Sequence, residues 1–360
     1  MRVGLDWRPT YSLRGGIPVY VRSLVAALVR RFPADDLRLY GHRLLRRGET
    51  GPRDSPPGAR LVTGLLPSRG AEALARLGFG ADRIVGGCDV FHMTDYAWLG
   101  PLRAPMVATV HDVLFDELPR CYTDSMRRGL RHVTRLLVAR SARLVVPSAR
   151  TKIGLVERYG ADPARVDVVP LAPRALPDVP PAAEPRPYLL AVGTLEPRKN
   201  WARALSAHAL ALSRGADLDL VLVGARGWLD GDLAARLKSS PRVRHEEAAS
   251  DARLCALYRG ATALVYPSLG EGFGLPVAEA MAAGLPVLTS AGTACAELAE
   301  GAALAVDPYD VEAMADALLR LAGDASLRAD LSARGLARAA SLTWERTAEG
   351  TRAAYERAAA

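Results

Sequence analysis

A proline-rich segment near the middle of the chain is the feature that most restricts its fold. Residues 171–187 read LAPRALPDVPPAAEPRP. This density of proline forbids a helix and disfavours a central strand. We therefore predict an extended linker over 171–187, with one domain before it (1–170) and another after it (188–342).

Both halves alternate short apolar runs with amphipathic stretches. In the first half we predict strands at Arg2–Asp6, Asp89–Thr94, Met106–Val110 and Arg143–Pro147. In the second we predict them at Tyr188–Val192, Leu218–Val223, Thr262–Tyr266 and Pro286–Thr289. Helices are predicted at Pro18–Arg31, Asp124–Ala142, Trp201–Ser213, Asp251–Arg259, Pro276–Ala283 and Val311–Ala322. This alternation predicts the α/β class, as two doubly wound, Rossmann-like domains that bind ligands at the carboxyl ends of their strands, in a central cleft.

The charge balance favours an anionic partner. Lys and Arg total 47 against 39 Asp and Glu, a net charge of +8, and only Lys152, Lys199 and Lys238 are lysines. Nucleotide phosphate, nucleic acid or an anionic membrane would suit this surface, and a plain solvated cationic surface is the alternative. No nucleic-acid recognition motif accompanies the charge, so we expect no nucleic-acid partner.

The sequence also indicates the cellular compartment of the protein. A hydrophobic fraction of 49% excludes general disorder, and no apolar run reaches the roughly 18 residues of a membrane span. The opening MRVGLDWRPT lacks the apolar core of a signal peptide, and the four cysteines form no CxxC pair. We therefore expect a cytoplasmic protein. The arginine-rich stretch 125–143 suggests peripheral contact with the inner membrane face, with a solvated helix face as the alternative.

The first segment with recognisable chemistry is LLAVGTLEPRKN, residues 189–200. An apolar strand ends at Gly193, and a short loop then carries Arg198 and Lys199 into a helix. A helix amino terminus and two cations together suit a diphosphate. Two solvated cations at a helix start are the alternative.

The second segment is YPSLGEGFGLPVAEAMAAG, residues 266–284. A strand is followed by a glycine-rich loop that lets the backbone approach a ligand closely, and then by a helix. Glu271 lies in the loop and Glu279 about one turn into the helix. A carboxylate can accept hydrogen bonds from two neighbouring hydroxyls, as in ribose binding.

SLGEGFGLPVAEAMAAGLPV resembles the glutamate–seven–glutamate signature of retaining glycosyltransferases of the GT-B fold, family GT4. AVGTLEPRKN is similar to the diphosphate loop of that family, and the pairs at 111–112 (HD) and 15–16 (GG) also match. The resemblance covers essentially the whole chain. It implies a metal-independent hexosyltransferase without a cofactor, and a C-terminal helix over 343–360 that packs back on the first domain.

The resemblance also implies roles for individual residues. His111 and Glu271 would be catalytic, with Glu271 near the anomeric carbon, Glu279 on the ribose, and Arg198 and Lys199 on the diphosphate. The remaining implied substrate contacts are Gly16, Asp112, Gly193, Thr194, Gly272, Phe273, Gly274 and Leu275. Many family members carry arginine where this chain has Thr194, so the phosphate-binding arginine here is expected to be Arg198, or its task is shared differently.

For the substrates, we expect GDP-mannose as donor, then UDP-glucose, with UDP-N-acetylglucosamine and dTDP-linked deoxysugars behind. The acceptor would be a glycan, a lipid-linked sugar or a small molecule in cell-surface polysaccharide or glycoconjugate synthesis. Front-face attack and a covalent intermediate on Glu271 both remain open as mechanisms. Alternative functions are a nucleotide-sugar epimerase or hydrolase of the same fold, and a non-catalytic nucleotide-binding relative.

Two weaker patterns, the DxD pairs and a histidine near an aspartate, have structural explanations. Asp217 with Asp219 and Asp230 with Asp232 form DxD pairs, for which turn and capping roles are expected rather than metal binding. His92 and Asp95 end a predicted strand and could line the cleft, with a buried structural histidine as the alternative.

Overall fold

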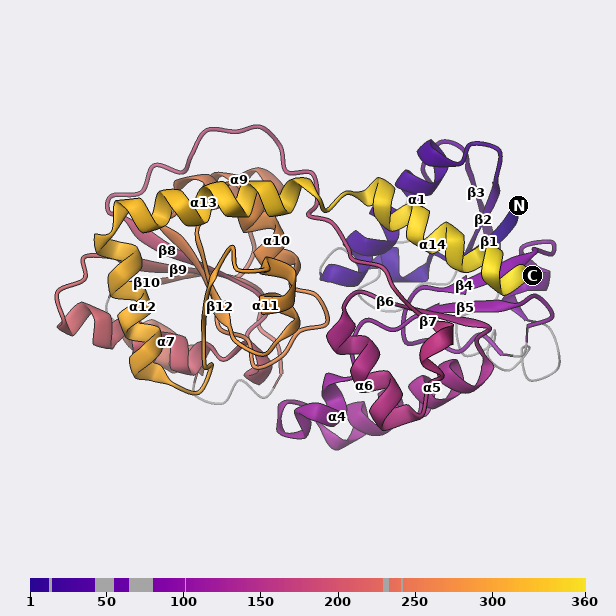
Figure 1. The fold of residues 1–360 in the computed structure, drawn as a ribbon, viewed down its shortest axis with the longest axis horizontal. Helices are drawn as coiled ribbons and strands as arrows, with labels where there is room; N and C mark the ends of the chain where they lie inside the picture. The colour runs from indigo at the N-terminus through magenta and orange to yellow at the C-terminus, as the bar shows by residue number, and fades with distance from the viewer. Residues whose placement is uncertain (13–14, 43–54, 65–79, 101, 229–232, 241) are drawn as a thin grey trace. The chain divides into compact units, whose positions relative to one another are not determined.

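The computed structural model describes residues 1–360 apart from 13–14, 43–54, 65–79, 101, 229–232 and 241 (Figure 1). The chain forms two compact units. Unit 1 comprises Met1–Val113, Asp124–Leu171 and Thr343–Ala360. Unit 2 comprises Leu114–Thr123 and Ala172–Leu342.

Unit 1 contains a seven-stranded parallel sheet in the order β3-β2-β1-β4-β5-β6-β7. Its strands are β1 (Arg2–Asp6), β2 (Asp36–His42), β3 (Ala59–Gly64), β4 (Val90–Met93), β5 (Met106–Thr109), β6 (Arg143–Val146) and β7 (Val166–Val168). The chain reverses its direction of winding between β1 and β4, where Val3 pairs with both Leu37 and Val90. Such a switch point opens a crevice at the carboxyl ends of the strands.

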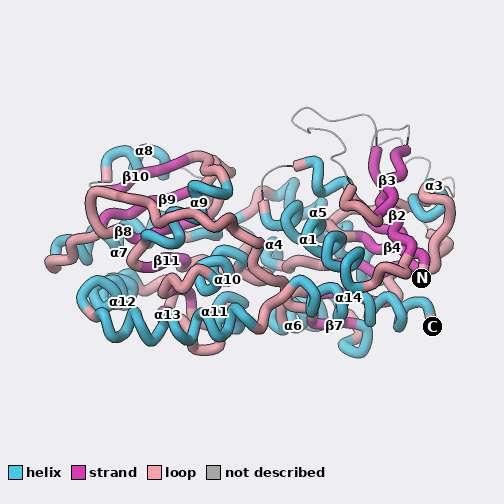
Figure 2. The backbone as a smooth tube through the Cα atoms, turned by 90° about the horizontal axis from the view of Figure 1, so that it is seen from above, coloured by secondary structure: helices cyan, strands magenta, loops and turns pink. Residues whose placement is uncertain are grey.

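Helices cover this sheet on both sides (Figure 2). The α-helices of unit 1 are α1 (Gly16–Arg31), α3 (Ala81–Ile84), α5 (Asp124–Arg140), α6 (Ala149–Tyr159) and α14 (Trp344–Ala359). α14, the last helix of the chain, lies against α1 (Figure 1). Arg31 of α1 pairs with Glu349 at 2.7 Å, and Arg352 pairs with Asp35 at 2.5 Å. The C-terminal helix is therefore part of unit 1.

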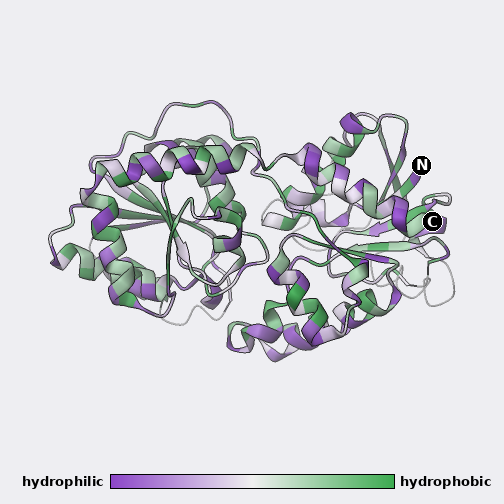
Figure 3. Cartoon of the chain, in the orientation of Figure 1, coloured by the Kyte–Doolittle hydropathy of each residue, from purple (hydrophilic) through white to green (hydrophobic). Residues whose placement is uncertain are grey.

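Unit 2 repeats the same winding in six parallel strands, ordered β10-β9-β8-β11-β12-β13. They are β8 (Tyr188–Val192), β9 (Asp219–Val223), β10 (Val243–Glu246), β11 (Ala263–Tyr266), β12 (Val287–Ser290) and β13 (Leu304–Val306). β8, β11 and β12 are buried along their whole length, as apolar strands covered on both faces must be (Figure 3). The switch point here lies between β8 and β11.

The α-helices of unit 2 are α4 (Leu114–Glu117), α7 (Trp201–Ser213), α8 (Leu233–Ser239), α9 (Asp251–Gly260), α10 (Leu275–Ala282), α11 (Ala294–Ala299), α12 (Val311–Gly323) and α13 (Ala325–Ala340). Short 3-10 turns complete the two units: Arg8–Tyr11 and Pro163–Arg165 in unit 1, Pro119–Cys121 and Pro197–Lys199 in unit 2. Several helices in both units begin at a side chain that accepts the backbone N–H three residues later, which satisfies a donor the helix cannot. These capping residues are Ser148, Ser250, Asp310, Asp324 and Thr343.

The proline-rich segment, predicted as an extended linker between two domains, is packed against one of them. It forms no helix or strand, but from Ala172 onward it belongs to unit 2. It is fixed to α9: Ala182 donates to the carbonyl of Ala256 (2.8 Å), and Arg259 pairs with Asp178 (2.6 Å). Leu114–Thr123, expected in the first domain, also belongs to unit 2. Prolines prevent regular structure but leave the carbonyls free to accept hydrogen bonds, so a packed extended segment satisfies the same sequence.

Candidate functional site

The main cluster of charged side chains in unit 2 lies at the switch point of its sheet. The 3-10 turn Pro197–Lys199 follows β8, and the loop 267–274 follows the adjacent strand β11. The two loops are tied together by their backbones, because Leu269 donates to the carbonyl of Arg198 at 2.8 Å. Two sequence segments about 70 residues apart thus form one site.

Lys199 is buried and faces the carboxylate of Glu271. Its Nζ lies 2.7 Å from Glu271 Oε1 and 2.5 Å from the Tyr266 hydroxyl. The same Oε1 also accepts from the hydroxyls of Ser268 (2.7 Å) and Tyr266 (3.0 Å). The ammonium, two hydroxyls and the carboxylate therefore form one closed network.

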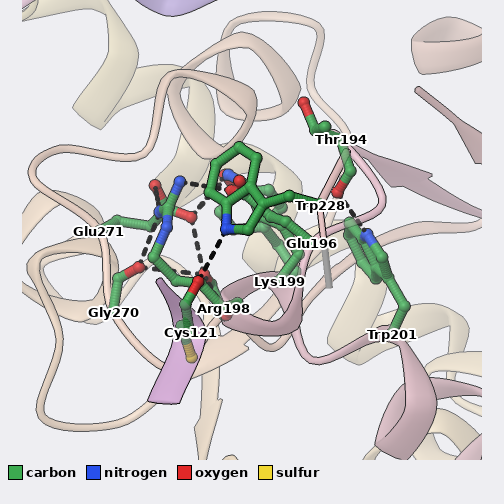
Figure 4. Close-up of polar contacts among 11 residues, drawn as sticks. Cys121, Thr194, Glu196, Arg198, Lys199, Trp201, Trp228, Gly270 and Glu271 are labelled. Carbon is green, nitrogen blue, oxygen red and sulfur yellow. Dashed lines mark hydrogen bonds and ion pairs between the residues drawn. The ribbon is translucent and has the colours of Figure 1, made fainter. Parts of the chain in front are cut away.

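Arg198 holds the other oxygen of Glu271. Its Nη1 lies 2.6 Å from Glu271 Oε2 and donates to the carbonyl of Gly270 at 3.0 Å (Figure 4). Its Nη2 pairs with Glu196, also buried, at 2.6 Å. Arg198 and Lys199 are thus matched by two carboxylates, and the four side chains together carry no net charge.

The charges in this cluster determine the protonation of Glu271. Burial raises the pKa of its carboxyl, but the charges of Arg198 and Lys199, with the hydrogen bonds from Lys199 and Ser268, outweigh burial and lower the pKa to about 2. Burial and the neighbouring negative charge of Glu271 hold the pKa of Tyr266 well above its usual value. Glu271 is therefore ionised at neutral pH, and it is a poor source of a proton.

Glycine allows the close approach of the loop that leads into α10. Gly274 has φ +105°, and a Cβ there would lie 2.6 Å from the Cys295 sulfur. Any other residue would therefore be strained and would clash. α10 begins at Leu275, directly after Gly272, Phe273 and Gly274, and the N–H groups of Val277 and Ala278 donate to the Gly274 carbonyl at 2.9 and 3.2 Å.

Glu279 forms a second, separate cluster one turn into α10. Arg174 approaches it as a fork, with Nε 2.6 Å from Oε1 and Nη2 3.3 Å from Oε2. The Tyr258 hydroxyl donates to Oε2 at 2.9 Å. Burial and the charge of Glu279 hold the pKa of Tyr258 well above its usual value. Arg174 lies in the proline-rich segment and was not predicted as a site residue, because the prolines around it indicated a linker.

The residues after β8 come close to the neighbouring loop after β9. A Cβ at Gly224 would lie 2.0 Å from the carbonyl oxygen of Gly193. Thr194 accepts a hydrogen bond from the Trp201 indole through its carbonyl at 3.0 Å. Thr194 is therefore half-buried and held through its backbone.

In unit 1, His111 follows β5 at the carboxyl edge of the sheet. Its Nε2 lies 2.9 Å from the carbonyl oxygen of Thr94, which can only accept, so this nitrogen carries the proton. The rings of Tyr20 and Tyr96 meet His111 edge-on at centroid distances of 5.1 and 6.3 Å. Asp112 is half-buried, and its N–H donates to the Tyr96 hydroxyl at 2.7 Å.

Gly16 is the exposed first residue of α1. His92, one residue before the end of β4, is fully buried and bonds Tyr355 and Thr109 at 2.7 Å each. It therefore has the structural role that was the alternative to lining a cleft.

The first DxD pair is engaged by an arginine. Asp217 and Asp219 lie 2.7 and 2.8 Å from Arg242. Asp230 and Asp232 lie outside the described residues. Across the part of the chain that the structure describes, no helix is long and apolar enough to cross a membrane.

Two family models match this chain. The family model for glycosyltransferase family 4 matches residues 14–172, and the one for glycosyl transferases group 1 matches residues 186–324. A D-inositol 3-phosphate glycosyltransferase from Salinispora arenicola is 30% identical over 320 residues, which cover 78% of this chain and 71% of the relative. The chain belongs to glycosyltransferase family 4.

Other relatives match over a shorter range. An O-antigen chain mannosyltransferase B from Escherichia coli is 39% identical over 173 residues, 47% of this chain and 45% of that protein. A D-inositol 3-phosphate glycosyltransferase from Nocardia farcinica is 34% identical over 62% of this chain and 54% of its own. This family 4 chain therefore spans about half the length of these relatives.

Solved structures share the fold of this family 4 member. Sucrose-phosphate synthase from Thermosynechococcus elongatus matches with a TM-score of 0.76 at 20% identity, over 99% of this chain and 98% of its own. WaaG, a glycosyltransferase involved in lipopolysaccharide biosynthesis, matches with a TM-score of 0.71 at 20% identity, over 98% of each chain. The predicted GT-B fold class, with two Rossmann-like parallel-sheet units, is confirmed.

Proposed function

We propose that this chain is a retaining glycosyltransferase that moves a hexose from a nucleotide-diphosphate sugar to a hydroxyl acceptor. GDP-mannose is the first donor proposed and UDP-glucose the second. The acceptor is a glycan, a lipid-linked sugar or a small molecule. The observation that carries the proposal is the cluster of Arg198, Lys199 and Glu271 at the switch point of unit 2, with the buried carboxylate of Glu279 on the helix that follows.

The cluster suits a leaving diphosphate. Cleavage of the bond between sugar and phosphate develops negative charge on the leaving oxygen, and fixed cations stabilise that charge without reorganisation. Arg198 and Lys199 are held in place by Glu271 before any substrate arrives. Their positions therefore depend little on the donor, which is the preorganised arrangement that electrostatic catalysis needs.

The state of Glu271 supports front-face attack over a covalent intermediate. Both carboxylate oxygens accept charged partners, and the pKa of about 2 marks a weakly basic, weakly nucleophilic group. In the proposed reaction the leaving phosphate takes the proton of the acceptor, and Glu271 holds the two cations and orients the sugar. His111 of unit 1 is also proposed as a catalytic residue.

The names of the relatives support GDP-mannose as the first donor proposed. The E. coli relative is named an O-antigen chain mannosyltransferase, which is consistent with a mannosyl donor and a cell-surface glycan product. The relatives named D-inositol 3-phosphate glycosyltransferase keep a phosphorylated polyol open as acceptor. The reaction needs no metal in this proposal, so full activity in the presence of EDTA is expected.

The first experiment is a thermal-shift panel of nucleoside diphosphates and nucleotide sugars. A ligand at 100 times its Kd should stabilise the native state by about 2.7 kcal/mol. Glu279→Gln should lose the shift, whereas Glu312→Gln, an exposed carboxylate of the same unit, should keep it. A shift with GDP and GDP-mannose alone supports the proposed donor, and the absence of any shift in the panel contradicts the proposal.

Turnover then separates the alternative functions. Conversion of the donor without an acceptor would indicate an epimerase or hydrolase. Binding without turnover against any glycan, lipid-linked or polyol acceptor would indicate a non-catalytic relative. Product in which the anomeric configuration of the donor is inverted would contradict the retaining mechanism.

Peripheral contact with an anionic membrane is also part of the proposal. α5 exposes Arg128, Arg135 and Arg140, and such a face attracts anionic lipid. Flotation with liposomes should depend on the anionic lipid fraction, and binding should weaken in an Arg128→Gln/Arg135→Gln variant. Flotation independent of lipid charge would contradict this contact.

A further inference from the structure

Arg174 binds the carboxylate of Glu279, which in the proposed function binds the ribose. Both oxygens of Glu279 are engaged by its guanidinium, at 2.6 Å and 3.3 Å, and the Tyr258 hydroxyl takes a further position at 2.9 Å. A carboxylate offers about four lone-pair positions. Three are filled, so one remains, whereas a pair of neighbouring hydroxyls needs two.

The surroundings of Arg174 offer it a second carboxylate. Its Nη1 lies 2.9 Å from Asp251 in the first turn of α9, and the Asp251 side chain is 71% exposed, against 4% for Glu279. The guanidinium thus bridges a buried carboxylate and an exposed one. It can leave Glu279 while it keeps a charged partner, which lowers the cost of release.

The backbone of the proline-rich segment is held by contacts that do not involve Arg174. The Cys255 thiol donates to the carbonyl of Pro177 at 3.0 Å, and Arg259 holds Asp178 and the carbonyl of Val179 at 2.6 Å each. These contacts all lie C-terminal to Arg174, and none involves Glu279. The exchange of partners therefore requires only rotation of the long arginine side chain.

We propose that Arg174 is a specificity-determining residue that competes with the ribose diol for Glu279. The proposal rests on the nucleotide site of the proposed function. Without a nucleotide the guanidinium orients the Glu279 carboxylate. When a ribonucleotide binds, the two hydroxyls replace the guanidinium, which stays on Asp251. Only a ligand with both ribose hydroxyls can displace it, so Arg174 sets how strongly the site depends on the sugar of the nucleotide.

The test compares GDP with 2′,3′-dideoxyguanosine diphosphate by calorimetry. The readout is the ratio of the two Kd values, because loss of a cation weakens both ligands alike and cancels in the ratio. Arg174→Gln should increase the preference for GDP about tenfold over the wild type. Arg174→Lys keeps the charge but cannot form the fork, and should increase the preference by a smaller factor. It also preserves the test if Arg174→Gln does not fold.

Asp251→Asn should act in the opposite direction. Without the second carboxylate, Arg174 stays more firmly on Glu279, and GDP should bind about two- to threefold more weakly, an effect typical of an exposed pair. In the Arg174→Gln background the same change should have no effect. Arg259→Gln removes the neighbouring clamp on the segment and serves as the matched control, with an unchanged Kd ratio.

Several outcomes would overturn the inference. An unchanged or smaller preference for GDP in both Arg174 variants would mean that Arg174 is a structural ion pair or a direct ligand of the nucleotide. The proposed function would survive that result, provided the wild type binds GDP. If neither the wild type nor any variant binds GDP, UDP or their sugar derivatives, the nucleotide site itself is refuted and the inference with it.

Discussion

The strand order is the same in the sheets of the two units, but the side chains at the two switch points interact in different ways. In unit 2, Lys199, Arg198, Glu271 and Glu196 form a charged network that is neutral overall. In unit 1, His111 rests on a backbone carbonyl between two tyrosine rings. The same strand order thus holds a network of charged side chains in one unit, and in the other a histidine between a backbone carbonyl and two aromatic rings. Charge gives a sequence signal, and neutral polar contacts give almost none.

We expect the largest loss of activity when a cation is removed from the charged cluster of unit 2. Lys199→Met should lower the rate of nucleoside diphosphate release from the donor about 10²- to 10³-fold, because one fixed group that stabilises the leaving group is lost. The measurement is turnover at saturating donor. Lys238→Met, at an exposed lysine of the same unit, is the matched control and should retain full activity. Equal rates in the two variants would contradict the role of Lys199.

Next in size is the effect of neutralising the carboxylate that joins the cations. Glu271→Gln should lower the free energy of unfolding at pH 7 by about 3 kcal/mol, since the buried Lys199 and the half-buried Arg198 lose their shared partner. Denaturant unfolding of the full chain measures this change. Glu312→Gln, an exposed carboxylate paired with Arg214 in unit 2, should cost well under about 1 kcal/mol.

The loss of stability in Glu271→Gln should depend on pH in the acid range. The pKa of Glu271 is about 2 in the native state, below its usual value near 4.5 in an unfolded chain. Its ionised form therefore contributes stability above pH 4.5, and this contribution is lost as the pH falls from 4.5 towards 2. The stability difference between wild type and Glu271→Gln should narrow over that window. A constant difference from pH 7 to pH 3 would show that charge is not the reason.

The central strands of unit 2 and several long helices could be predicted from the sequence, whereas the edge strands of that sheet could not. Tyr188–Val192 and Trp201–Ser213 agree with β8 and α7 at both ends. These elements are buried, so their apolar pattern is strong. β10, with the sequence VRHE, was missed because an edge strand buries little and carries polar residues.

The contacts that the site residues make could not be predicted from the sequence either. Arg198, Lys199 and Glu271 were predicted as site residues, but nothing local indicated that Glu271 would hold both cations. That pairing depends on two loops about 70 residues apart, brought together by the sheet order. Arg174 was missed for a related reason, since its role comes from contact with a helix about 100 residues later.

A smaller effect is expected from the buried histidine of unit 1. Burial, with a contribution from the charge of His111, lowers the pKa of His92 to about 3. Between pH 6.5 and 3 the unfolded chain binds a proton that the native state does not, so stability falls as the pH falls. Relative to His92→Gln, the wild type should lose about 2 kcal/mol between pH 7 and pH 5, at about 1.4 kcal/mol per pH unit below 6.5. Parallel stability profiles for the two proteins would contradict a neutral buried His92.

At α14, loss of a buried neutral hydrogen bond should reduce stability more than loss of an exposed ion pair. α14 is held to unit 1 by a buried hydrogen bond between Tyr355 and His92 and by an exposed ion pair between Glu349 and Arg31. Tyr355→Phe removes only the hydroxyl, leaves His92 Nδ1 without its partner, and should cost about 1–2 kcal/mol. Glu349→Gln breaks a pair whose side chains are about half exposed, and should cost no more than about 0.5 kcal/mol. If the exposed pair proved the more costly to lose, unit 1 would depend on charge as unit 2 does, and the contrast between the two units would fail.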